Sequence, residues 1–268
     1  MYVCISSDPH HHSPYSQGAT VGGPCGGGHE GPLPRPDPDQ QTFWHSWGHV
    51  VSRDGVRWRR VADALTPTAT GIDHGAVCDG AVSFPSDSMP PVMMYGPGCG
   101  FYFPKGQEPP AGIARPANLS DDLMVRWTKQ QPLTFAPGSP PCFIAGRVWR
   151  GTDGVFNMVC ITGGLQPPFS HTLPDARYTS TNASLQGPWT LADASFAGHI
   201  HGLSGSVMFV PLPSPRPGDP SHILSNGPGG HFAVGTYNET TGKFETSGTF
   251  DVAPGVAFSA AGLAEDKR

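Results

Sequence analysis

Helix-breaking residues constrain this chain more than any other feature. It has 36 glycines and 31 prolines among 268 residues, a quarter of its length. Each glycine or proline inside a helix is unfavourable, so this density excludes a helical bundle or a coiled coil. The glycines have no period of three, which excludes a collagen-like fold. We therefore predict a turn-rich, all-β protein, and the length allows one large domain or two small ones.

The charge balance and the hydropathy exclude further classes. The chain has 16 Lys and Arg against 21 Asp and Glu, a formal net charge of −5. No basic stripe is present, so nucleic acid is not an expected partner. No apolar run approaches the roughly 18–20 residues of a membrane span, so no membrane partner is expected. The oligomeric state is not indicated.

Signals for the cellular compartment conflict. The first 15 residues lack the basic and apolar regions of a secretory signal. Yet three N-glycosylation sequons begin at Asn118, Asn182 and Asn238. The six cysteines contain no close Cys-x-x-Cys pair, so they allow disulfides without requiring them and leave the pairing open. Localisation stays open, and a missing or altered N-terminus would reconcile these signals.

Composition divides the chain at residue 42. Residues 1–42 are polar and rich in glycine and proline, and they are predicted to be a low-complexity, disordered segment because they cannot bury enough apolar surface. Residues 10–12 are all histidine, but no carboxylate or cysteine stands at ligand spacing, so no metal site is predicted. Residues 43–268 are predicted to form one β domain.

Within residues 43–268, short runs rich in Val, Phe, Tyr and Met alternate with turn residues, a pattern typical of strands. Glycine at positions 154 and 242 marks predicted hairpin turns. A sandwich, a barrel and a propeller are all compatible with this spacing. The predicted strands are 47–52, 76–84, 91–95, 147–149, 156–161, 206–210, 221–224, 231–237 and 243–250.

Ordered local motifs distinguish among these folds. Residues 47–54 read WGHVVSRD, and VRW at 56–58 and ALTP at 64–67 follow. This order resembles the "WGHAVSxDLxxW…ALxP" stretch of glycoside hydrolase family 32, the invertase, levanase and fructan-hydrolase family. Residues 73–81, DHGAVCDGA, stand at the place of the family's "DxxGxFSGSA".

The resemblance continues along the chain. PVMMY at 91–95 is similar to "PxxLYTG", and RPANLSDDL at 115–123 is similar to the plant-type "YPANLSDPL". GTYN at 235–238 matches the "GTYD" of a later blade. The resemblance implies a five-bladed β-propeller and a β-fructofuranosidase activity on terminal β-fructosides such as sucrose or fructan. It implies no metal or organic cofactor, because the family's chemistry rests on carboxylates.

The carboxylates that this chemistry needs are absent at the matching positions. A retaining glycosidase uses one carboxylate as nucleophile and another as acid and base, and the family adds an aspartate in an Arg-Asp-Pro motif. Here Ile144-Ala145-Gly146 replaces that motif, Gly205 stands at the acid/base glutamate, and the nucleophile motif "NDPNG" does not occur.

Several residues are candidates for a remodelled site. Asp8 is the nearest substitute for the nucleophile, although its spacing to Trp47 is longer than in the family. Cys78 and Asp79 lie in the segment that lines the family's sugar pocket. Asp79 could bind a sugar hydroxyl or act as a displaced acid; the alternative is a solvated strand-end aspartate. Trp44 is a candidate for stacking on a sugar ring.

Other polar and aromatic residues receive structural interpretations. Asp54, Asp73 and Asp153 are predicted to be turn residues. His199 and His201 are interpreted as an exposed loop pair rather than acid–base groups. Most of the other tryptophans are predicted to lock adjacent propeller blades together.

Three hypotheses for the whole chain remain: a family hydrolase with a crippled site, a non-catalytic carbohydrate-binding propeller, or an altered or partial chain that does not fold stably. Residues 250–258 resemble the start of the family's last blade, and the sequence stops at residue 268. A propeller that is incomplete at both ends and lacks the family's C-terminal β-sandwich is therefore expected, with exposed strand edges.

Overall fold

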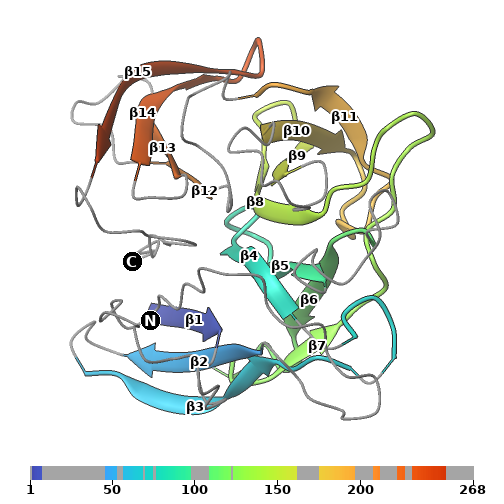
Figure 1. The fold of residues 1–268 in the computed structure, drawn as a ribbon, viewed down its shortest axis with the longest axis vertical. Helices are drawn as coiled ribbons and strands as arrows, with labels where there is room; N and C mark the ends of the chain where they lie inside the picture. The colour runs from blue at the N-terminus through green and yellow to red at the C-terminus, as the bar shows by residue number, and fades with distance from the viewer. Residues whose placement is uncertain are drawn as a thin grey trace, which may run out of the picture.

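In the computed structural model, the regular elements of the described residues are all β-strands (Figure 1). The structure describes residues 2–7, 46–52, 57–68, 70–74, 77–97, 109–121, 123–161, 175–196, 208–211, 222–226 and 231–251. These ranges contain fifteen strands and no α-helix. None of them therefore holds a helix long and apolar enough to span a membrane.

The strands form four antiparallel sheets, each in chain order. The first sheet contains β1 (Tyr2–Ser7), β2 (Trp47–Ser52) and β3 (Arg59–Leu65). The second contains β4 (Val77–Ser83), β5 (Val92–Pro97), β6 (Gly112–Pro116) and β7 (Trp127–Lys129). The third contains β8 (Ile144–Arg150), β9 (Phe156–Ile161), β10 (Asp175–Ser180) and β11 (Thr190–Asp193). The fourth contains β12 (Met208–Pro211), β13 (His222–Asn226), β14 (His231–Asn238) and β15 (Lys243–Asp251).

The sheets surround a common centre, with the first strand of each sheet innermost (Figure 1). The third sheet contacts the second and the fourth through inner strands, since β8 packs against β4 and β12. This is a β-propeller, as predicted. The prediction of a fifth blade, and of ends that lack the C-terminal sandwich, concerns residues outside the described ranges.

The alternating sides of one strand explain how the propeller core is built. Met93 and Tyr95 of β5 pack in a cluster with Trp47 and Leu65 of the first sheet. Val92 and Met94 pack instead in a larger cluster with residues of the third sheet. Successive side chains of a strand point to opposite faces. A blade between two others therefore buries both faces, which accounts for the unbroken apolar run of β5.

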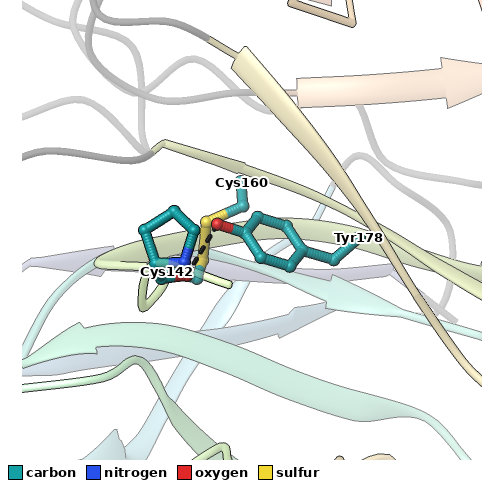
Figure 2. The surroundings of a disulfide bond; sticks show 4 residues. Cys142, Cys160 and Tyr178 are labelled. Carbon is teal, nitrogen blue, oxygen red and sulfur yellow. Dashed lines mark hydrogen bonds between the residues drawn. A yellow bond between two sulfur atoms is a disulfide. The ribbon is translucent and has the colours of Figure 1, made fainter. Parts of the chain in front are cut away.

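A disulfide adds a covalent link to the third sheet. Cys142 and Cys160 are fully buried, are bonded through their sulfurs, and have Cα atoms 5.7 Å apart. The Tyr178 hydroxyl beside them donates a hydrogen bond to the Pro140 carbonyl at 2.8 Å (Figure 2). Burial raises the pKa of Tyr178 to about 12. The sequence left this pairing open.

One part of the low-complexity prediction needs correction. Residues 2–7 form strand β1, which pairs with β2 from Tyr2↔Ser52 to Ser7↔Trp47. Six residues cannot form a core, but their backbone groups complete the hydrogen-bonding ladder of a sheet built by later residues. β1 thus belongs to the first sheet, and for the rest of residues 1–42 the division at residue 42 stays a prediction.

Candidate functional site

The inner strands β4 and β8 run side by side in the same direction. The Val148 amide donates to Ser83 Oγ at 3.0 Å, and the Arg150 amide donates to the Pro85 carbonyl at 2.7 Å. Because both contacts follow the same order along both segments, the starts of β4 and β8 lie at the same end of the propeller. β4 starts at Val77, just before Cys78 and Asp79, and β8 starts at Ile144.

Both inner strands are bulged near their starts. Cys78 lies opposite Gly96 and Gly80 lies opposite Tyr95, so Asp79 is the extra residue on β4. On β8, Ala145 lies opposite Cys160 and Val148 lies opposite Met158 of β9, so β8 has one extra residue between these two pairs. Bulges re-aim side chains and are over-represented next to active sites. Other bulges interrupt the pairs β2–β3, β10–β11 and β14–β15. The bulges of β4 and β8 differ from these because they lie on the inner strands of their sheets.

Gly80 lets β4 lie close to β5 beside the Asp79 bulge. A Cβ atom on Gly80 would lie 1.9 Å from the Met94 carbonyl oxygen. Real side chains do not approach a backbone atom so closely, so only glycine lets β4 press onto β5 here. The two bulged strand starts, Val77–Gly80 and Ile144–Arg147, are the candidate site.

Two of the predicted site residues, Cys78 and Asp79, lie in the described part of the chain. Asp79 is the bulge residue of β4, Cys78 precedes it, and Ala145 lies on the neighbouring β8 at the same end. Asp8 and Trp44 lie outside the described residues, as do Asp54, His199, His201 and Gly205. Whether Asp8 or Trp44 joins Asp79 at this site therefore stays a prediction.

Arg147 is a charged residue of the site that the sequence reasoning missed. It lies in the bulge of β8, and burial lowers the pKa of its guanidinium to about 10. It therefore keeps its charge near neutral pH and carries only hydrogen-bond donors. The signal was available, because Arg147 is a charged residue in an otherwise apolar predicted strand.

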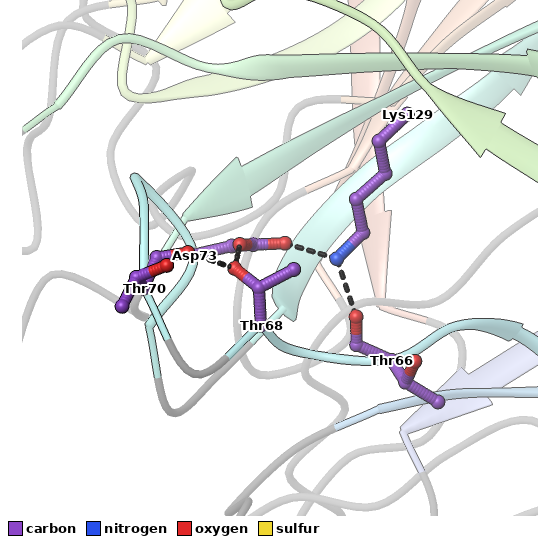
Figure 3. Close-up of polar contacts among 5 residues, drawn as sticks. All are labelled: Thr66, Thr68, Thr70, Asp73 and Lys129. Carbon is purple, nitrogen blue, oxygen red and sulfur yellow. Dashed lines mark hydrogen bonds and ion pairs between the residues drawn. The ribbon is translucent and has the colours of Figure 1, made fainter.

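A partly buried ion pair holds the loop that leads into β4 (Figure 3). Asp73, which is 3% exposed, accepts hydrogen bonds from Thr68 Oγ1 at 2.5 Å and from Lys129 Nζ. Lys129, on β7, also donates to the Thr66 carbonyl. Asp73 is thus a structural turn residue, as predicted, and its partner ties the loop to the outer edge of the second sheet.

Tyr95 lies beside this ion pair. Lys129 Nζ lies 5.9 Å from the centre of the Tyr95 ring. Burial, together with the negative charge of Asp73, raises the pKa of Tyr95, so its hydroxyl stays protonated. Within the described residues, no group of three or more His, Cys, Asp or Glu side chains is arranged to hold a metal ion.

The fold is that of the propeller glycoside hydrolases. The chain superposes on fructan 1-exohydrolase IIa from Cichorium intybus with a TM-score of 0.57 at 24% identity, covering 81% of this chain and 41% of that one. It superposes on a fructofuranosidase from Schwanniomyces occidentalis with a TM-score of 0.51 at 18% identity, covering 82% of this chain and 43% of that one.

No protein-family model matches the chain, but part of it is similar to curated plant enzymes. Over 116 residues it is 34% identical to the β-fructofuranosidase insoluble isoenzyme 6 of Oryza sativa subsp. japonica, which covers 41% of this chain and 18% of that protein. Over 152 residues it is 28% identical to the fructan 6-exohydrolase of Triticum aestivum, which covers 52% of this chain and 24% of that protein. Over the part that aligns, the chain is similar to plant β-fructofuranosidases and to a fructan hydrolase. It spans well under half the length of these relatives.

Proposed function

We propose that this chain is a β-fructofuranosidase-type propeller that binds terminal β-fructosides, such as sucrose or fructan, at the bulged starts of β4 and β8. The observation that carries the proposal is the likeness to the plant β-fructofuranosidases. The chain also matches the propeller fold of fructan 1-exohydrolase IIa, and this match supports a site on the inner strands.

Relatives support a sugar ligand. The Cichorium intybus enzyme was solved in complex with 1-kestose, and the Schwanniomyces occidentalis enzyme in complex with fructosylnystose. Sugars present many hydroxyl groups, each able to donate and accept hydrogen bonds. Asp79 offers carboxylate acceptors and Arg147 offers donors, so the proposed site contains both kinds of partner.

Two versions of the proposal differ in whether hydrolysis survives. Hydrolysis with retention needs two carboxylates about 5–5.5 Å apart, and Ala145 and Gly205 supply none. Loss of a general acid or of a covalent nucleophile removes several powers of ten in rate. This observation favours a propeller that binds fructosides and turns them over slowly or not at all.

Fructose release from sucrose and from inulin, measured at about pH 5 beside a mock purification, tests hydrolysis. Release above the mock supports substituted acids, and loss of that release in Asp8→Asn or Asp79→Asn identifies the group. Without release, calorimetric titration with 1-kestose tests the binding version. Binding without hydrolysis supports that version, and a folded protein that neither binds nor hydrolyses contradicts both.

A matched pair of variants tests where the ligand binds. Asp79→Asn keeps the shape but removes the charge, and we expect about tenfold weaker binding of 1-kestose. Asp153→Asn is the control, because Asp153 is exposed and caps the β8–β9 turn by accepting from the Val155 amide at 2.9 Å. Equal affinities for the two variants would contradict a site at the start of β4.

A further inference from the structure

The loop between β3 and β4 leads directly into the candidate site. β3 ends at Leu65 and β4 begins at Val77, so Asp79 follows the loop by only a few residues. Leu65 and Val77 are both buried, and they pack in one cluster with Tyr95 of β5. Any contact that fixes this loop therefore also affects where β4 begins.

The described part of this loop is held by hydrogen bonds around Asp73 (Figure 3). Thr68 Oγ1 donates to Asp73 at 2.5 Å, and Thr68 also forms an isolated β-bridge with His74. Lys129 Nζ donates to Asp73 and to the Thr66 carbonyl. Asp73 is almost fully buried, and the Lys129 side chain is 22% exposed. One ammonium group of β7 therefore fixes two points of the loop.

Tyr95 connects the same ammonium group to the bulge from the other side. The backbone of Tyr95 lies opposite Gly80, the residue after Asp79, and opposite Gly112 of β6. The buried Tyr95 ring covers Gly112, because a Cβ atom there would lie 2.2 Å from the ring. Lys129 Nζ lies 5.9 Å from the centre of this ring, within the range of a cation–π contact. Lys129 thus interacts both with the loop before β4 and with the residue that pairs beside the bulge.

We infer that Asp73, Lys129 and Tyr95 are positioning residues that hold the Asp79 bulge in the conformation that binds a fructoside. This assignment rests on the proposed function, because it concerns the same site. Asp79 is the extra residue of the bulge, so no residue of β5 lies opposite it. Its place therefore depends on the chain on either side, which is the loop fixed at Asp73 and the pair formed by Gly80 and Tyr95.

The chemistry of the ion pair explains why it can position the loop as well as stabilise it. Hydrophobic contacts are non-directional, whereas hydrogen bonds require a defined distance and angle. The Lys129 ammonium has three donors, and two of them reach the loop, at Asp73 and at the Thr66 carbonyl. Uncharged side chains of similar size could fill the same space, but they would not fix both of these points.

The double variant Asp73→Asn/Lys129→Met separates positioning from stability. It removes both charges, so no unpaired carboxylate stays buried, and part of the stability that Lys129→Met loses is expected to return. The hydrogen bonds from the ammonium group to the loop stay absent. Calorimetric titration with 1-kestose is therefore expected to show about tenfold weaker binding in Lys129→Met and in the double variant alike.

Lys243→Met is the matched control for these titrations. It makes the same side-chain change in the exposed Lys243–Asp193 pair, which joins β15 to β11 far from β4 in the chain, and it should leave the affinity unchanged. Each titration is made at a temperature at which thermal melting shows the variant to be folded. An affinity that returns together with stability in the double variant would overturn the inference, because the ion pair would then be structural only.

Backbone hydrogen exchange gives a second measurement that needs no ligand. In the double variant, amides of β4 are expected to exchange about tenfold faster than in the unaltered chain, whereas amides of β9 should exchange at the same rate. Equal exchange of β4 in the two proteins would overturn the inference whether or not a fructoside binds. If the unaltered chain binds no fructoside, the proposed function fails, and the exchange of β4 alone decides whether the ion pair holds the bulge.

Discussion

Trp149 of β8 and Tyr237 of β14 meet edge to face, with ring centroids 5.4 Å apart and ring planes at 90°. The two residues belong to different sheets, and Phe209 of β12 packs on the same indole with centroids 4.7 Å apart. Such aromatic pairs contribute about 0.5–1.5 kcal/mol beyond the area that they bury. This contact holds the fourth sheet on the third, as predicted for the tryptophans of the propeller.

Trp149→Ala is expected to lower the free energy of unfolding by about 3–5 kcal/mol, because it empties an aromatic cluster between two sheets. Urea denaturation followed by circular dichroism measures the loss. Trp58→Ala is the matched control, since Trp58 is 39% exposed, and a much smaller loss is expected there. Equal losses in the two variants would show that Trp149 does not join the sheets.

Lys129→Met is expected to destabilise the chain by about 3–5 kcal/mol, because it leaves the buried Asp73 carboxylate without its counter-charge. The double variant Asp73→Asn/Lys129→Met should recover part of that loss. Lys243→Met is the control: the Lys243–Asp193 pair, at 2.6 Å, has a Lys243 side chain that is 57% exposed. Exposed pairs contribute only about 0.2–1 kcal/mol. Thermal melting of the unaltered chain and of the three variants distinguishes these expectations.

His49 is expected to make stability depend on pH. It is 1% exposed, and neither ring nitrogen has a hydrogen-bond partner within the described ranges. Burial lowers the pKa of His49 below its ordinary value of 6.5, and the backbone of Val125 and the charge of Asp121 oppose this shift only in part. Below pH 6.5 the unfolded chain therefore binds a proton that the folded chain resists.

The free energy of unfolding is thus expected to fall as the pH drops below 6.5, by up to about 1.4 kcal/mol per pH unit from this residue. Urea denaturation between about pH 7.5 and 5 measures the slope. His49→Gln should flatten it, whereas His74→Gln should not, because the His74 side chain is exposed in the folded chain. An unchanged slope in His49→Gln would refute this origin of the pH dependence.

Gly80→Ala is expected to destabilise the chain by about 1–3 kcal/mol or more, because its new methyl group overlaps the Met94 carbonyl. Gly248→Ala is the matched control in another strand, since a Cβ atom there would meet nothing within 4 Å. Differential scanning calorimetry compares the two. If both variants melt together, β4 does not need a glycine beside the Asp79 bulge.

How much of the fold can be predicted from sequence depends on the strand. Apolar runs predicted β2 and β9 with the bounds that the structure shows. They missed β3, which reads RRVADAL, and β10, which reads DARYTS, because charged and polar residues interrupt the signal. Such strands are held in place by hydrogen bonds to neighbouring strands, and one sequence segment does not reveal its neighbours.

The candidate site, like the strands, could be predicted from the sequence only in part. The sequence marked Cys78 and Asp79 through a family resemblance, but it did not show that Asp79 is the bulge residue of an inner strand. It also did not single out Arg147 in the neighbouring bulge. A bulge is a mismatch between two strands, so it is a property of their pairing rather than of either strand alone.

The sequence by itself determined that this chain is turn-rich and all-β, that its motifs resemble those of a propeller hydrolase family, and that residues 145 and 205 carry no carboxylate. Short β-rich runs between helix breakers are local features, and side-chain identity needs no fold. Only the tertiary structure paired Asp73 with Lys129, 56 residues apart, and placed Arg147 in a bulge of β8. Those properties depend on which distant segments the packed sheets bring into contact.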